Sequence, residues 1–115
     1  MAKQLELLES YKVIQWRDAN RGLWPELGLL IHVPNEGKRS PQAAISLVKA
    51  GLVAGVADFL LLSRLLAIEM KSERGTVSKK QVEFGRLFVQ FGGQYHICRS
   101  AIECVAIIKK VMGIA

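Results

Sequence analysis

The chain has 115 residues, half of them hydrophobic, which is enough for one domain with a single core and excludes a disordered segment. Its 16 Lys and Arg residues outnumber its 10 Asp and Glu residues, and the resulting net charge of +6 favours a polyanionic partner such as nucleic acid. The two cysteines, Cys98 and Cys104, lack the spacing of a thiolate metal site, and the chain starts without an apolar leader. We therefore expect a protein of the reducing cytoplasm.

Apolar periodicity and capping residues predict eight elements in one α/β domain over residues 1–115. The first half is predicted to form a helix over 4–19, a strand over 27–33, and a helix over 41–50 that Ser40 caps and Gly51 ends. The second half is predicted to form two strands within 55–71, a helix from Ser78, a strand over 94–98, and a helix from Ser100 to Gly113.

Residues 51–70 are almost continuously apolar, and Gly51 and Gly55 form a GxxxG pair of the kind found in packed membrane helices. Asp58 and Arg64 lie near the centre of this segment, where each would cost about 2.5 to 3.5 kcal/mol to insert. We therefore predict a buried hairpin and no contact with a membrane.

The charges in this hairpin are predicted to converge. If the strands turn around Ser63 and Arg64, the numbers of paired residues sum to 127, and Asp58 lies opposite Glu69 with Lys71 on the same face. Two converging carboxylates suit Mg²⁺ or Mn²⁺, and an adjacent lysine can orient a water or stabilise a phosphate. Spacing alone equally allows solvated edge-strand charges, and a turn without Gly, Asn or Asp allows a longer loop or a one-residue slip.

The pattern Asp58, then Glu69-Met70-Lys71, resembles the D...ExK motif of the PD-(D/E)xK nuclease superfamily. Four blocks narrow this resemblance to the VRR-Nuc (virus-type replication-repair nuclease) family: "WPELGLLIHVPNEGKRS", "KAGLVAGVADFLLL", "LAIEMKSERGTVSKKQVEF" and "QYHICRSAIECVAII". Three features depart from the family pattern: Ala57 replaces a proline, Glu36 replaces a glycine, and the hairpin is short.

The resemblance implies a restriction-endonuclease-like fold and a metal-dependent, structure-specific DNA endonuclease. It implies Mg²⁺ or Mn²⁺ held by Glu9, Asp58, Glu69 and the Met70 carbonyl, and it assigns catalytic roles to Asp58, Glu69, Lys71 and Gln81. Relatives that stand alone resemble virus-encoded homodimers that act on branched DNA such as four-way (Holliday) junctions, which would place this chain in the host cytoplasm. The alternatives are a non-catalytic DNA-binding or assembly module with this fold, and a nicking or exonuclease activity of relaxed structure preference.

A basic loop before the second helix is the expected contact with DNA, because a helix N-terminus and an arginine both favour phosphate. The residues assigned to DNA binding are Asn35, Lys38, Arg39, Ser40, Lys79 and Lys80. A solvated loop explains the first four equally well, and the two lysines would contact phosphates at most. Gln81 also has a structural explanation, because Ser78 and Gln81 have the spacing of a capping box.

Overall fold

A computed structural model describes residues 2–33 and 40–115 of the chain. The strands of its mixed sheet, in spatial order, are β1 (Leu30–His32), β2 (Phe59–Leu61), β3 (Leu66–Met70) and β4 (Gln94–Cys98). The helices are α1 (Ala2–Asn20), α2 (Pro41–Lys49), α3 (Lys79–Gln90) and α4 (Ala101–Met112), with 3₁₀ turns η1 (Pro25–Leu29) and η2 (Leu62–Arg64). Neighbouring strands are antiparallel except for β3 and β4, which are parallel. This order of helices and strands agrees with the predicted order.

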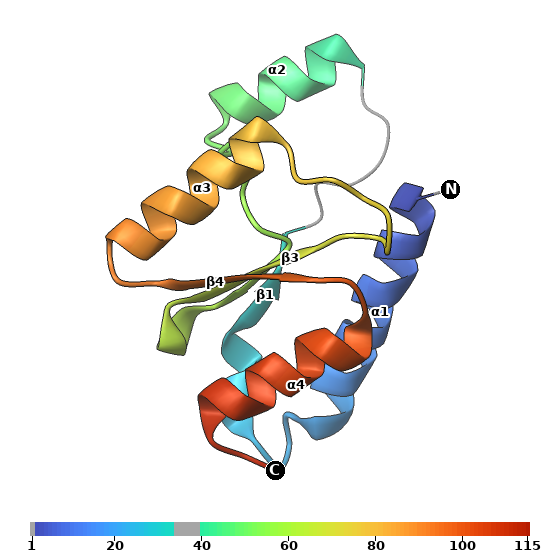
Figure 1. The fold of residues 1–115 in the computed structure, drawn as a ribbon, viewed down its shortest axis with the longest axis vertical. Helices are drawn as coiled ribbons and strands as arrows, with labels where there is room; N and C mark the ends of the chain where they lie inside the picture. Colours follow the sequence, from blue (N-terminus) through green and yellow to red (C-terminus); the bar gives the residue numbers. More distant parts are fainter. Residues whose placement is uncertain (1, 34–39) are drawn as a thin grey trace.

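The two faces of the sheet are covered by different helices (Figure 1). Helix α3 lies over one face and packs on β4, whereas α1 and α4 pack on each other against the opposite face. The alternation of side chains along β3 explains this division. Ile68 and Met70 point into the core beneath α1 and α4, and Glu69 points to the face that carries α3.

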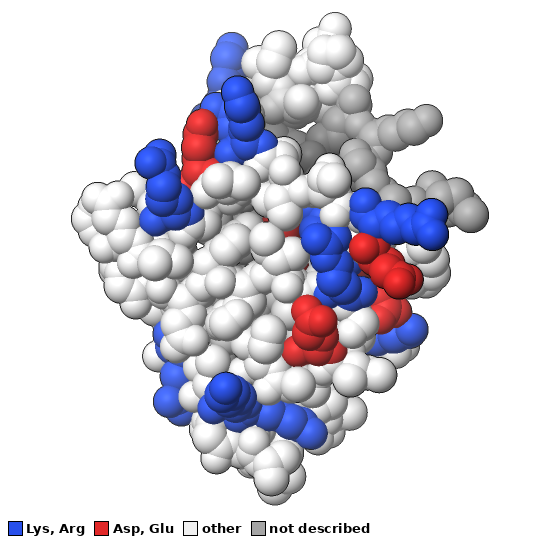
Figure 2. All heavy atoms as spheres, viewed as in Figure 1, with Lys and Arg blue, Asp and Glu red and all other residues white. Residues whose placement is uncertain are grey.

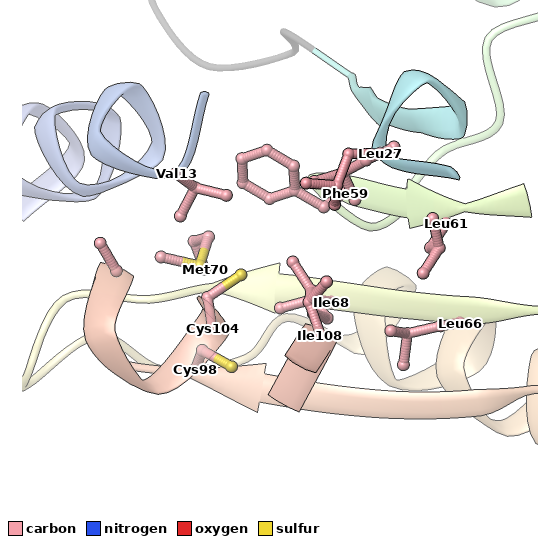
Figure 3. Packing of buried hydrophobic residues seen from close by; sticks show 12 residues of the cluster. Val13, Leu27, Phe59, Leu61, Leu66, Ile68, Met70, Cys98, Cys104 and Ile108 are labelled. Atoms are coloured by element: carbon pink, nitrogen blue, oxygen red, sulfur yellow. The ribbon is translucent and has the colours of Figure 1, made fainter. Parts of the chain in front are cut away.

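The hydrophobic core lies between the sheet and the pair α1 and α4 (Figure 3). Its buried members come from both helices, η1 and all four strands: Val13, Leu27, Leu30, Phe59, Leu61, Leu66, Ile68, Met70, Cys98, Ala101, Cys104 and Ile108. Both cysteines are free thiols and fully buried, so they act as small apolar residues. The core therefore fixes β3 on one side and leaves its other side for a polar site.

The hairpin has the predicted register, because Phe59 pairs with Ile68 and Leu61 with Leu66. Its turn lacks the usual Gly or Asn and instead uses η2, followed by Leu65 in the left-handed region at φ 50°. Glu26 holds this turn in place, accepting hydrogen bonds from Arg64 Nε at 2.6 Å and Nη2 at 2.9 Å. Arg64 therefore anchors the turn to η1.

The strand predicted over residues 27–33 is shorter in the structure, since only Leu30–His32 are extended and Pro25–Leu29 form η1. Pro25 favours the first turn of a helix, and the Leu27 N–H donates to the Trp24 carbonyl at 3.0 Å. Leu27 is fully buried from this turn. The apolar run therefore reflects burial in the core and does not require an extended backbone.

The helix predicted over 41–50 is confirmed as α2, with Ser40 Oγ accepting from the Ala43 N–H at 3.1 Å and Gly51 at φ +107° after its end. None of its side chains is buried. No helix within residues 2–33 and 40–115 combines the length and apolar character needed to cross a bilayer. Residues 51–70 contribute β2 and β3, in agreement with the predicted hairpin.

Candidate active site

Asp58 and Glu69 are buried carboxylates beside each other in the β2–β3 hairpin. Asp58 directly precedes β2, Glu69 lies within β3, and each is only 3% exposed. The pair Phe59 and Ile68 is in register, and one further step brings Asp58 opposite Glu69. Asp58 Oδ2 accepts the Met70 N–H at 2.7 Å, which confirms that its side chain reaches β3.

Glu69 is contacted by a cation and by an amide on the face that carries α3. Lys71 follows β3 and places its Nζ 3.9 Å from Glu69 Oε2, with only 12% of its side chain exposed. The Gln81 Nε2 donates to the same oxygen at 2.9 Å. The structure thus brings Asp58, Glu69, Lys71 and Gln81 together. Strand alternation predicted this for the first three residues, and the family resemblance implied it for Gln81.

Gln81 belongs to the first turn of α3 and has a structural role as well. Its Oε1 accepts the Ser78 N–H at 2.9 Å, and the Ser78 Oγ accepts the Gln81 N–H at 3.2 Å, which completes the predicted capping box. Gly55 lies against this turn at φ +79°, and a Cβ there would lie 2.2 Å from the Lys80 carbonyl oxygen. Only glycine permits this approach, which holds the start of α3 near the hairpin.

The segment after Lys71 is held by two charged residues that sequence analysis did not single out. Glu6 Oε2 accepts the Ser72 N–H at 3.2 Å. Arg99 Nη1 donates to the Ser72 carbonyl at 2.8 Å and also to the Gly75 carbonyl. Glu6 lies 66 residues from Ser72 and Arg99 lies 27 residues from it, so no local sequence signal could have identified these contacts.

Glu9, predicted as a metal ligand, occupies a different place in the structure. Its Oε1 accepts the Ala101 N–H at 3.0 Å, at the start of α4, and its Oε2 lies 2.6 Å from Lys12 Nζ. Lys12 and the Ala101 N–H lower the pKa of Glu9 below its usual value. The structure does not bring Glu9 to Asp58 and Glu69, since no group of three or more His, Cys, Asp or Glu suited to a metal occurs in the part of the chain that is described.

The residues predicted to bind DNA are only partly described. Ser40 caps α2, in agreement with its predicted structural role as the residue that begins this helix. Lys79 and Lys80 are exposed in the first turn of α3, beside Gln81, and Lys80 Nζ lies 4.0 Å from Glu83 Oε2. The remaining loop residues lie outside the described residues: Asn35, Glu36, Lys38 and Arg39.

The charges of Asp58 and Glu69 affect the pKa of Tyr95 in the neighbouring strand β4. Burial raises the pKa of Tyr95 well above its usual value, and the charges of Glu69 and Asp58 raise it further. Tyr95 therefore lies near both carboxylates, on the face of the sheet that carries α3. Two carboxylates suit Mg²⁺ or Mn²⁺, which commonly take one or two from a protein and complete their coordination with water and phosphate.

No protein-family model and no curated protein matches this sequence. Among solved structures, a protein titled "VRR_NUC domain protein" is similar, with a TM-score of 0.61 and 16% sequence identity. The match covers 77% of this chain and 71% of the other. With the four-stranded mixed sheet flanked by helices, this likeness confirms the predicted fold class, the restriction-endonuclease-like α/β fold.

Proposed function

We propose that this chain is a metal-dependent endonuclease that hydrolyses DNA phosphodiester bonds and acts preferentially on branched DNA such as four-way junctions. The observation that carries the proposal is the contact of buried Glu69 with both Lys71 and Gln81, beside buried Asp58. A fold shared with a protein titled "VRR_NUC domain protein" supports the nuclease class. The net charge of +6 supports a nucleic-acid partner.

Asp58, Glu69 and the Met70 carbonyl are the groups proposed to hold Mg²⁺ or Mn²⁺. The ion, when bound, would stabilise charge on the scissile phosphate and lower the pKa of a water. Lys71 would position the attacking water, because its ammonium lies 3.9 Å from Glu69 Oε2 and is mostly shielded from solvent. Gln81 would keep Glu69 in the required orientation through its 2.9 Å hydrogen bond.

Lys79 and Lys80 are proposed to contact phosphates, since they are exposed in the helical turn that also contains Gln81. The described residues of this 12.7 kDa chain form one such site, so cutting both strands of a junction calls for two copies. We therefore propose a homodimer in which each copy cuts one strand.

The experiment is cleavage of linear, nicked, flap and four-way DNA by the purified protein, with Mg²⁺, with Mn²⁺ and with chelator. The proposal expects metal-dependent internal cuts and a preference for branched substrates. Release of single nucleotides from ends, or equal cutting of all four substrates, would refute the proposed substrate class. DNA binding without cleavage under every metal condition would instead identify a non-catalytic binding module.

A further inference from the structure

Strand β4 forms one edge of the sheet and differs sharply from the opposite edge. The opposite edge, β1, has three residues, which is one way in which proteins limit unwanted strand pairing. β4 has five residues in unbroken register with β3. Its sequence, QYHIC, contains no Lys, Arg, Asp, Glu or Pro. It therefore lacks the charges, prolines and bulges that normally protect an exposed edge.

Backbone groups of β4 point away from the sheet. The Gln94 N–H donates to the Leu65 carbonyl at 2.9 Å, and the Cys98 carbonyl accepts the Lys71 N–H at 2.9 Å. In a parallel ladder, alternate residues of a strand bond to the same neighbour. The N–H and C=O groups of Tyr95 and Ile97 are therefore directed outward, where the described residues provide no further strand.

Apolar hollows lie on both sides of this strand. On the α3 side, a hollow of about 480 Å³ is lined by Val77, Val82, Gly85, Arg86, Val89, Tyr95 and Ile97. On the α4 side, a hollow of about 400 Å³ is lined by Gln94, His96, Ile107, Lys110 and Val111. We call the strand together with these two hollows the β4 edge. Figure 2 shows its centre as a largely uncharged surface between α3 and α4, with charged side chains around it.

We infer that the β4 edge is the surface on which two copies of this chain associate, with the two β4 strands paired antiparallel. Two copies that each carry a charge of +6 repel each other, so a stable contact requires a surface with little charge. No residue of β4 is charged, and the charged residues that line its two hollows are Arg86 and Lys110, one in each. The β4 edge lies on the broadest face of the molecule, whose extents are 42 × 33 Å (Figure 1).

The outward groups fix the register of this pairing. Opposing Tyr95 to the partner's Ile97, and the reverse, lets both residues of each strand exchange hydrogen bonds across the interface. The two-fold axis then passes beside His96. The His96 residues of the two copies face each other as a non-hydrogen-bonded pair, with Cα atoms about 4.5 Å apart. The two sheets would form a single sheet of eight strands.

The two-fold arrangement also determines how the two active sites are oriented, an inference that rests on the proposed function. A two-fold axis between antiparallel strands of one sheet is perpendicular to the sheet, so directly opposed residues lie on the same face. The face that carries Asp58, Glu69 and Lys71 would then point in the same direction in both copies. Two sites facing one side could act on two strands of one branched DNA molecule.

The first experiment measures molar mass by light scattering over a concentration series. Wild type should have twice the mass of the 12.7 kDa chain. Val89→Lys should shift it towards monomer, because each copy then places an ammonium in the hollow beside β4. Leu87→Lys is the matched control, since Leu87 lies on the same helix with nearly equal exposure, 56% against 54%, and does not line that hollow. A wild-type monomer, or a Val89→Lys protein as dimeric as its control, would refute the interface.

The second experiment tests the register with His96→Cys. The opposed Cα atoms at about 4.5 Å allow a disulfide, so mild oxidation should give a covalent dimer. The fully buried Cys98 and Cys104 should leave wild type uncrosslinked. Failure of His96→Cys to crosslink would refute this register. Metal-dependent cleavage by a monomer would refute the β4 dimer and the proposed homodimer but leave the nuclease activity standing, and a crosslinked dimer without cleavage would refute only the proposed nuclease activity.

Discussion

Gln81 joins two functions in one side chain, and Gln81→Glu should separate them. A glutamate keeps the acceptor for the Ser78 N–H, so the capping box survives. It removes the donor that lies 2.9 Å from Glu69 Oε2, and a hydrogen bond to a charged group contributes about 1.5 to 3 kcal/mol. It also places a new carboxylate beside that of Glu69. Two carboxylates about 4 Å apart repel each other by about 4 kcal/mol at an effective dielectric constant of about 20.

The new side chain is half-buried and can rotate towards solvent, so we take the lost hydrogen bond as the expected cost, about 2 kcal/mol. At on the order of 4 °C per kcal/mol, the melting temperature in chelator at pH 7 should fall by about 8 °C. Millimolar Mn²⁺ should recover part of this loss, because an ion at the site offsets the added negative charge.

The control is Ser78→Ala, which breaks the cap and leaves the Gln81 amide free to contact Glu69. It should cost about 1 kcal/mol, independently of metal. A Gln81→Glu protein as stable as wild type in chelator would refute the structural role of the contact between Gln81 and Glu69. Equal responses of the two variants to Mn²⁺ would refute its connection with a metal.

Three further predictions concern the other carboxylates. Hydrogen bonds from Arg64 and then Ser63 lower the pKa of Glu26 from 4.5 to about 2, so its contribution to stability is present above pH 4.5 and is lost as the pH falls towards 2. In urea unfolding, Glu26→Gln should therefore lose less stability than wild type over that range, and parallel pH curves would contradict this. Glu9→Gln should lower stability by up to about 1 kcal/mol, because Glu9 accepts a hydrogen bond at the start of α4. It should leave the metal-induced shift in melting temperature unchanged, and loss of that shift would identify Glu9 as a metal ligand. Asp58→Asn should melt at a higher temperature than wild type in chelator, because it removes one of two opposed charges. It should also lose most of the stabilisation by metal, which in wild type reaches about 2.7 kcal/mol at a metal concentration of about 100 times Kd. A mutant less stable than wild type in chelator would contradict the repulsion between Asp58 and Glu69.

The elements of this fold were predictable where local chemistry determines them. The capping residues Ser40, Ser78 and Ser100 each accept a hydrogen bond from the third residue of a helix, and these helix starts were correctly predicted. The register of β2 and β3 agrees with the one predicted from a turn around Ser63 and Arg64. The strand over 27–33 was predicted too long because burial of Leu27 gives the same apolar pattern in a 3₁₀ turn as in a strand.

The site was predictable to the extent that it lies within one hairpin and the helix that follows. Strand alternation, a local pattern, brings Asp58, Glu69 and Lys71 together, whereas the contact of Gln81 with Glu69 was implied only by the family resemblance. The position of Glu9 depends on how α1 packs against α4, which no local pattern determines. For the same reason, the contacts of Glu6 and Arg99 with the segment after Lys71 were not predicted.

The central claim is that Lys71 acts at the Asp58 and Glu69 site, and a single-turnover cleavage rate tests it most directly. Lys71→Ala and Lys79→Ala each remove one positive charge, but only Lys71 lies beside Glu69, at 3.9 Å, whereas Lys79 is exposed at the start of α3. With saturating protein, branched DNA and Mn²⁺, we predict that Lys71→Ala abolishes cutting while it still binds the DNA, and that Lys79→Ala cuts at nearly the wild-type rate. Cutting by Lys71→Ala at the wild-type rate would contradict the account.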